Sequence, residues 1–166
     1  ERTEFSCLLT HLNHDSCIDL HHEVTKGVTL LSYGRGCPRP VYVGSSPKTI
    51  ISHLPKQGIL DYYRRFSTQL AEVGFAQNDQ EFLNKMKKIK KQGYYFSNGE
   101  VDPNVSGLSV PIKFSSKEPP LALTVLGSRK RFEFVNLDKL IEVLHSNAAL
   151  IEQQFMALST QTTSEL

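Results

Sequence analysis

Two predicted strands with small residues along one face constrain the fold of this chain more than any other feature. Alternate side chains of a strand point to opposite faces, so residues 107–112 present one apolar face and one small or hydroxylated face. Residues 121–126 repeat this pattern less strictly, and the short turn-forming segment 115–120 between them predicts an antiparallel pair. The face with small side chains comprises Gly107, Ser109, Ala122 and Thr124.

The small-residue face has two interpretations. It can form the floor of a pocket that offers a few hydrogen-bonding groups to a small molecule. It can also be covered closely by a helix, since small residues often serve close packing. The residues alone favour the helix, and both interpretations stay open at this point.

Apolar periodicity predicts the elements around these strands. Residues 5–12 and 137–158 have helical spacing, so we expect helices at both ends of the chain that pack together. Residues 18–24 alternate as a strand, and Lys26-Gly27 predicts a turn into a second strand over residues 28–33. A further short strand is predicted at residues 41–43.

Three more helices are predicted before the two strands. Pro47 is well placed as a first helical residue, which predicts a helix that stops near Leu54-Pro55. Residues 59–70 predict a second helix. The third has clear ends, because Asn78 and Glu81 form a capping-box pattern and Gly93 is a stop signal.

Composition limits the class of protein. A chain of 166 residues suits one domain, which we place at residues 1–158, followed by a flexible polar tail over residues 159–166. A net charge of +2 does not indicate a polyanionic partner, and no apolar run approaches the roughly 20 residues of a membrane helix. The three cysteines lack metal or redox spacing, which indicates a reducing, cytoplasmic location.

Metal and enzyme sites are both weakly supported. His11, His14, Cys17, His21 and His22 cluster in the sequence, but neighbouring strand residues point to opposite faces, so we expect no metal site. The chain has no G-x-S-x-G elbow, no glycine-rich phosphate loop and no recognisable Cys/His spacing. We therefore expect no catalytic residues and no cofactor.

The order of four short motifs is more specific than any of them alone. Gly93-Tyr94 is followed by a polar loop, then "VSGLSVPI", a turn, "LALTVLG" and "SRKRF", and "VGSSPKTIISHLP" lies upstream. Over residues 17–158 this order resembles the effector-binding domain of the IclR family of bacterial transcriptional regulators. The resemblance implies an α/β (α+β) domain with a GAF/PAS-like, mostly antiparallel twisted sheet and flanking helices, in addition to the long terminal helices.

The resemblance also implies partners. Family members attach this domain behind an N-terminal winged helix-turn-helix, which we do not find in this sequence, so we expect contact with DNA only through that missing domain. It further implies self-association as a dimer or tetramer, a small-molecule effector and no membrane contact.

Effector contacts are carried over from the family to matching positions. These positions are Ser45, Ser46, Ser97, Gly107, Ser109, Thr124 and Leu126. The two serines stand at a predicted helix start, where free backbone N–H groups favour a carboxylate. We therefore expect a small organic acid as effector, and Leu126 allows an aromatic one.

Two positions depart from the family pattern. Pro47 replaces the usual glycine before the helix lysine and removes an N–H group, and Ser97 stands where many members have an acidic residue. The departures predict either a different effector or a domain without one. The alternative function is therefore a dimerisation or scaffold module of the same fold, with the C-terminal helix packed on another chain.

Overall fold

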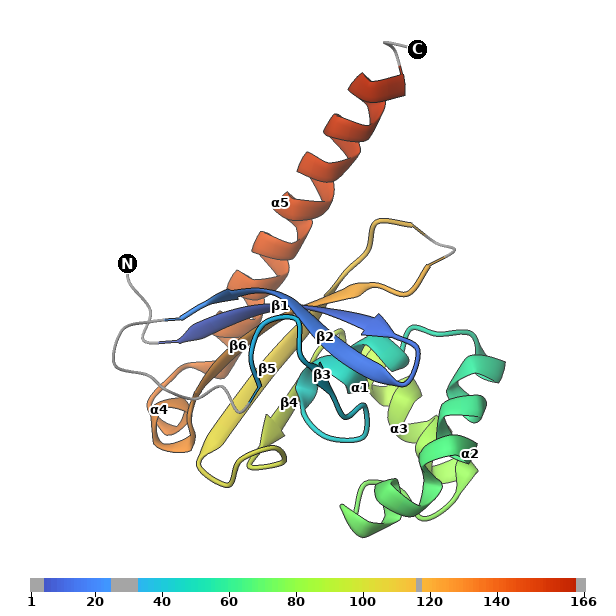
Figure 1. Cartoon of the computed structure of the whole chain (residues 1–166). Coiled ribbons are helices and arrows are strands. Elements are labelled where there is room, and N and C mark those ends of the chain that lie inside the picture. The colour runs from blue at the N-terminus through green and yellow to red at the C-terminus, as the bar shows by residue number, and fades with distance from the viewer. Residues whose placement is uncertain (1–4, 25–32, 116–117, 164–166) are drawn as a thin grey trace.

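The computed structural model of the chain describes residues 5–24, 33–115 and 118–163. Its centre is an antiparallel sheet with strand order β3-β2-β1-β6-β5-β4 (Figure 1). The strands are β1 (Ser6–Asn13), β2 (Ser16–Glu23), β3 (Pro38–Arg39), β4 (Tyr95–Asn98), β5 (Val105–Ile112) and β6 (Leu121–Ser128). This mixed α+β architecture with a mostly antiparallel sheet is the predicted fold class.

Helices cover both faces of the sheet. Two pack on one face, α4 (Arg129–Glu133) and α5 (Leu137–Thr163), and three lie on the other, α1 (Ser45–Ile51), α2 (Lys56–Glu72) and α3 (Asp79–Gln92). Figure 1 shows that α5 crosses the sheet and that its C-terminal half extends beyond it. On the face with three helices, α1 packs directly on β5 and β6.

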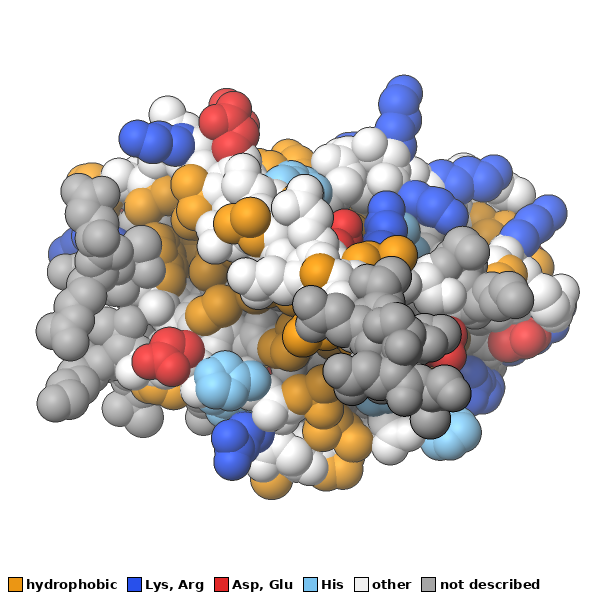
Figure 2. Space-filling model, turned by 90° about the horizontal axis from the view of Figure 1, so that it is seen from above, with side chains coloured by type: hydrophobic (Ala, Val, Ile, Leu, Met, Phe, Trp, Pro, Cys, Tyr) orange, Lys and Arg blue, Asp and Glu red, His pale blue; other side chains and the backbone are white. Residues whose placement is uncertain are grey.

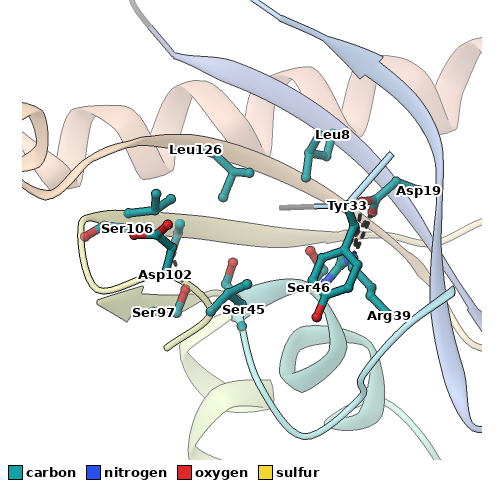
Figure 3. A pocket seen from close by; sticks show the side chains of 14 residues that line it. Leu8, Asp19, Tyr33, Arg39, Ser45, Ser46, Ser97, Asp102, Ser106 and Leu126 are labelled. Carbon is teal, nitrogen blue, oxygen red and sulfur yellow. Dashed lines mark hydrogen bonds and ion pairs between the residues drawn. The ribbon is translucent and has the colours of Figure 1, made fainter. Parts of the chain in front are cut away.

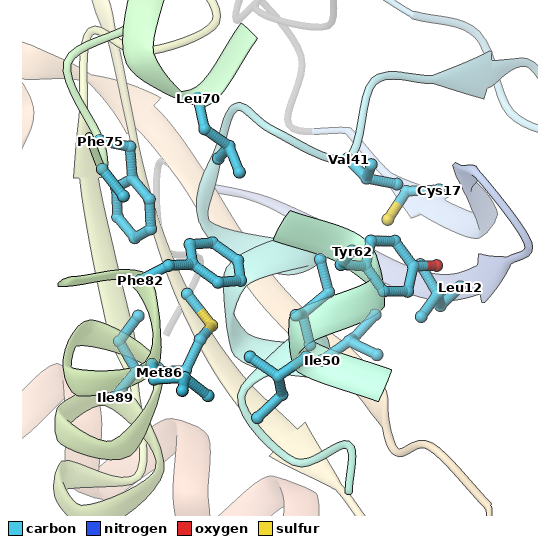
Figure 4. Packing of buried hydrophobic residues seen from close by; sticks show 14 of the residues in the cluster. Leu12, Cys17, Val41, Ile50, Tyr62, Leu70, Phe75, Phe82, Met86 and Ile89 are labelled. Atoms are coloured by element: carbon cyan, nitrogen blue, oxygen red, sulfur yellow. The ribbon is translucent and has the colours of Figure 1, made fainter. Parts of the chain in front are cut away.

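The two layers have separate hydrophobic cores. Between the sheet and α1, α2 and α3, side chains such as Ile50, Phe82 and Met86 pack closely (Figure 4). On the other face, alternate residues of β5 meet Leu144 and Ala148 of α5. The face of β5 with small side chains therefore belongs to the first core, toward α1.

The predicted pairing of β5 and β6 is confirmed. Ser109 lies opposite Thr124, Gly107 opposite Leu126 and Pro111 opposite Ala122. Residues at directly opposite positions share a sheet face, so the small residues of both strands do lie together.

The predicted ends of α3 are also confirmed. Asn78 Oδ1 accepts a hydrogen bond of 2.9 Å from the Glu81 backbone N–H, and Gly93 ends the helix at φ 81°. The Glu81 carboxylate accepts the N–H of Gln77, one residue before the cap. Together these bonds satisfy donors that a helix start leaves without partners.

The prediction of an N-terminal helix is wrong, because residues 6–13 form β1. Their burial alternates with period two, with Leu8, Thr10 and Leu12 on the buried side. The other side is partly buried against the second core, so leucines occur on both faces and imitate helical spacing. A strand at this place completes the sheet between β2 and β6.

Other boundaries differ from the predicted ones. A turn at residues 14–15 connects β1 to β2. The hairpin turn predicted at Lys26-Gly27 and most of the strand predicted at 28–33 lie outside the described residues. Residues 41–43 are not a strand, and β3 stands just before them. α1 begins at Ser45, ahead of Pro47, and α2 extends the helix predicted at 59–70 at both ends.

The predicted C-terminal helix is confirmed and longer than expected. α5 continues to Thr163, through residues that we predicted as the start of a polar tail. Of the helices in the described residues, none combines the length and the apolar character that crossing a bilayer requires.

Cysteine labelling tests the placement of β2 in the core. Cys17 is fully buried and Cys37 is exposed, and burial raises the pKa of the Cys17 thiol to about 12. Because the thiolate is the reactive form, we expect iodoacetamide at about pH 8.5 to label Cys17 roughly a thousandfold more slowly than Cys37. Mass spectrometry of timed samples gives both rates, with protein unfolded in urea as the control. Equal rates in the folded protein would contradict this burial.

Candidate functional site

A cavity opens where the start of α1, the loop after β4 and the strands β1, β2, β5 and β6 meet (Figure 3). It contains about 530 Å³ of empty space, its open mouth included. Its apolar lining comes from Leu8, Val101, Val105 and Leu126, and its polar lining from Asp19, Arg39, Ser45, Ser46, Ser97, Asp102 and Ser106. An apolar pocket with a few placed polar groups is the usual form of a small-molecule site.

The structure brings five of the seven predicted effector-binding residues to this cavity. They are Ser45, Ser46, Ser97, Gly107 and Leu126. The other two, Ser109 and Thr124, are fully buried behind the lining, under α1. Those two hydroxyls are therefore separated from the cavity by other side chains.

Ser109 and Thr124 belong to a chain of hydroxyl groups between the sheet and α1. Ser109 Oγ donates to Ser45 Oγ at 2.7 Å and lies 2.7 Å from Thr124 Oγ1, which in turn lies 2.9 Å from Ser46 Oγ. Buried hydroxyls without partners cost about 1–3 kcal/mol each, so this network fixes how α1 sits on the strands.

The two interpretations of the small-residue face therefore apply to different parts of it. α1 covers the part that holds Ser109 and Thr124, and the cavity lies over the part that holds Gly107 and Leu126. A Cβ atom on Gly107 would lie 2.8 Å from Leu126 Cδ2 and 2.9 Å from Ser45 Oγ. Glycine at this position keeps the floor of the cavity low.

A buried ion pair, which was not predicted from the sequence, lies in the lining of the cavity. Arg39 is 9% exposed and Asp19 is 2% exposed. Arg39 Nη2 donates to Asp19 Oδ1 at 2.9 Å and to Thr10 Oγ1 at 3.0 Å, and Arg39 Nε donates to Asp19 Oδ2 at 3.2 Å. Figure 3 shows this pair beside Ser46 and Tyr33.

Arg39 lines the cavity and has donors that Asp19 and Thr10 do not use. A guanidinium has five N–H donors in a fixed plane, and those of Nε and Nη2 point to Asp19 and Thr10. Nη1 makes no hydrogen bond within the described residues and lies 3.9 Å from the position of a Cβ on Gly44, another lining residue. Asp19 was the signal in the sequence that could have revealed this pair. It is a carboxylate inside a predicted strand, and a charge that is buried there needs a partner of opposite charge.

A second ion pair lies on the other side of the α1 start. Glu100 Oε2 accepts from the Gly44 backbone N–H at 2.9 Å and from Lys48 Nζ, and Glu100 Oε1 accepts from the Tyr95 hydroxyl at 2.9 Å. Lys48 is buried, and this burial lowers its pKa against the opposing effect of Glu100. Burial also raises the pKa of Tyr95, so its hydroxyl remains a donor to Glu100.

Possible metal ligands do not gather in the part of the chain that the structure describes. No group of three or more His, Cys, Asp or Glu side chains there could hold a metal ion. Cys17 faces the first core, whereas the side chain of His21 is 61% exposed. His22 Nε2 lies 3.3 Å from Asp19 Oδ2, beside the ion pair described above.

Comparison with known proteins gives one family. Residues 1–153 match the family model described as "Bacterial transcriptional regulator IclR C-terminal". No curated protein sequence matches the chain. The C-terminal domain of a transcriptional regulator from Vibrio cholerae is similar in structure, with a TM-score of 0.74 and 21% identity over 87% of this chain and 84% of that one.

Two similar structures contain aromatic acids. An IclR homologue from Microbacterium hydrocarbonoxydans in complex with 4-hydroxybenzoate has a TM-score of 0.76 and 19% identity, over 92% of this chain and 61% of that one. The inducer-binding domain of PobR from Acinetobacter, a double mutant in complex with 3-hydroxybenzoic acid, has a TM-score of 0.73 and 14% identity, over 90% of this chain and 89% of that one. At these identities the likeness shows the fold.

Replacing one hydroxyl tests the network under α1. Thr124→Val keeps the shape of the side chain but leaves Ser46 and Ser109 without a shared partner, so we expect a loss of about 1–3 kcal/mol of unfolding free energy. Thr49→Val is the matched control, because Thr49 is equally buried and its hydroxyl makes a single bond of 3.4 Å to the Ser109 carbonyl. Urea denaturation measures both. An equal loss in the two variants would contradict a special role for the network.

Proposed function

Because the chain belongs to the IclR family of bacterial transcriptional regulators, as an effector-binding C-terminal domain, we propose that its cavity binds a small organic acid. The family and the structural neighbours are transcriptional regulators and not enzymes. Occupancy of the cavity would then control DNA binding by an N-terminal domain of the same regulator.

The observation that carries the proposal is that Arg39 Nη1, in a residue of the cavity lining, makes no hydrogen bond to any described residue. Its Nη1 group offers two N–H donors toward the cavity, while Asp19 and Thr10 hold the rest of the guanidinium in place. A fixed guanidinium is well suited to bind a carboxylate, and its rotamer entropy is lost on folding and not on binding. Ser46, in the same lining, can add a hydroxyl donor.

The rest of the lining favours an acid with an apolar, flat body. Leu8, Val101, Val105 and Leu126 supply apolar surface, and Gly107 leaves a low floor between them. Ser97 and Ser106 lie near the loop after β4 and could bind a ring hydroxyl. The aromatic acids bound to the Microbacterium and Acinetobacter proteins have this form, which supports an aromatic acid here.

We propose that occupancy acts through α1. Ser45 and Ser46 line the cavity and also hold α1 on the sheet through the hydroxyl network. A ligand shifts the balance between two arrangements only by binding one of them better. An acid that forms hydrogen bonds with these serines would stabilise one position of α1 on the sheet over another. The DNA-binding domain would respond to that change in position.

Binding of 4-hydroxybenzoate to the protein and to an Arg39→Met variant tests the proposal. At a hundred times its Kd, a ligand that binds only the folded state adds about 2.7 kcal/mol of stability. We expect calorimetry and thermal unfolding to show binding of 4-hydroxybenzoate, 3-hydroxybenzoate or benzoate, and a loss of at least about tenfold in affinity in Arg39→Met. The neutral amide of the same acid should bind weakly to both proteins.

Arg64→Met is the control for this test, because Arg64 is exposed on α2, away from the cavity. Its affinity for the acid should equal that of the unchanged protein. If none of the acids binds, or if the amide binds as tightly as the acid, the proposed acid site is wrong.

We also propose that the chain self-associates through α5. Val143 and Leu150 are 48% and 55% exposed and stand two helical turns apart, on one face of the helix. From the side toward which α5 extends, hydrophobic side chains are exposed between the charged ones (Figure 2). Exposed apolar side chains in a row are typical of an interface between subunits.

Leu150→Glu tests this association. A charge in the middle of an apolar interface between two helices costs several kcal/mol, so we expect sedimentation to show mainly monomer in this variant. Val73→Glu adds the same charge at a similarly exposed valine at the end of α2 and should leave the oligomer unchanged. A monomeric unchanged protein, or equal behaviour of the two variants, would contradict the proposal.

A further inference from the structure

The loop after β4 forms part of the rim of the cavity. Val101 and Asp102 of this loop line the cavity, together with Val105 at its end. On the opposite side of the mouth, a Cβ on Gly44 would lie 3.1 Å from Val101 Cγ2. The loop therefore closes against the segment that leads into α1.

This loop is bound to itself and behaves as one unit. The Gly99 N–H donates to the Val105 carbonyl at 2.9 Å, and the Val105 N–H donates to the Asp102 carbonyl at 3.0 Å. The Asn104 N–H donates to Asp102 Oδ1 at 2.8 Å. Gly99 has a φ of 73°, which favours glycine, at the point where the loop leaves β4. Arg129, the first residue of α4, holds the loop through the carbonyls of Asn104 and Pro103, so the contact toward α1 must come from another residue.

Glu100 supplies that contact. Its side chain is absent from the cavity lining and points instead into a separate cleft that Lys48 and Tyr95 share. There its carboxylate receives the Gly44 N–H, the Lys48 ammonium and the Tyr95 hydroxyl, from the segment before α1, from α1 and from β4. One side chain of the loop is thus bound to three elements that surround the cavity.

The surroundings of Lys48 make this contact hard to replace by water. Lys48 is 2% exposed, and its Nζ lies 4.2 Å from the ring centroid of Phe75 and 5.1 Å from that of Tyr95. An ion pair is stronger in such a place than at the surface, and the loss of one partner leaves a buried charge.

We infer that Glu100 is a positioning residue that holds the rim of the cavity closed and thereby sets how long an effector stays bound. It acts through Gly44 and Lys48 and does not touch the effector. The inference rests on the proposed function, because it concerns the same cavity. It adds that the Lys48–Glu100 pair governs the dissociation rate, while the choice of acid depends on other residues.

Dissociation rates in the variants Glu100→Gln and Lys48→Met/Glu100→Gln test this inference. Glu100→Gln leaves Lys48 charged and unpaired, so its thermal midpoint should fall. The double variant removes both charges and should recover much of that midpoint. We expect the acid that binds most tightly among 4-hydroxybenzoate, 3-hydroxybenzoate and benzoate to dissociate on the order of tenfold faster from both variants. The order of affinities among the three acids should not change.

Asp15→Asn/Arg65→Met is the matched control. This pair also joins two elements, the β1–β2 turn and α2, but lies away from the cavity lining. Its removal should leave the dissociation rate unchanged. If the double variant of Lys48 and Glu100 recovers the dissociation rate together with the midpoint, Glu100 supports only the fold and the inference is wrong.

Hydrogen exchange without any acid tests the rim separately from the proposed function. We expect the Arg129 amide, which donates to the Asn104 carbonyl of the loop from outside it, to exchange at least about tenfold faster in the double variant, because this bond breaks when the loop moves, while amides inside α3 keep their rates. Unchanged exchange at Arg129 would overturn the inference, even if an acid binds. Faster exchange in a protein that binds no acid would support the rim and reject the proposed effector.

Discussion

The packing of α1 on the small-residue face of β5 and β6 is the contact on which the rest of the site depends. The bonds that join Ser45, Ser46, Ser109 and Thr124 satisfy hydroxyls that would otherwise be buried without partners. They also place Ser45, the first residue of α1, beside Gly107, so the helix covers the part of the face that holds Ser109 and Thr124 and leaves the part at Gly107 and Leu126 to the cavity. A larger residue at Ser109 or Thr124 would lift the helix and change both halves.

Two buried ion pairs lie on either side of this contact, and their surroundings differ. The pair of Asp19 and Arg39 is held by a bidentate contact and by Thr10, and it leaves donors toward the cavity. The pair of Lys48 and Glu100 is surrounded by Phe75 and Tyr95 and faces away from the cavity. Buried pairs contribute little net stability compared with apolar side chains of similar size, so their value here is in fixing positions. We propose that the pair of Asp19 and Arg39 orients a group for binding and that the pair of Lys48 and Glu100 fixes the rim.

Local patterns predicted the parts of the fold that local forces decide. The caps of α3, the antiparallel pair of β5 and β6 and the C-terminal helix follow from residues a few positions apart. The N-terminal strand was mistaken for a helix because β1 has apolar residues on both faces, and one of its two neighbours in the sheet, β6, is far away in the sequence. Arg39 was missed for the same reason, since its partner Asp19 lies across β2 and β3. The family resemblance located five of the residues that line the cavity, and no periodicity could have shown which part of the sheet α1 leaves uncovered.

The segment from Gly44 to Ser46 is where these contacts meet. Gly44 binds Glu100 through its N–H, Ser45 binds Ser109, and Ser46 approaches Thr124, while all three residues line the cavity. A ligand that forms even one hydrogen bond with this segment competes with, or adds to, bonds that hold α1 and the rim. A buried hydroxyl has a single hydrogen to donate, so it donates to one acceptor or to another. Under the proposed function, a change at the cavity would reach α1 as a choice between two positions of the helix on the sheet, which is the form of response that a sensor domain needs.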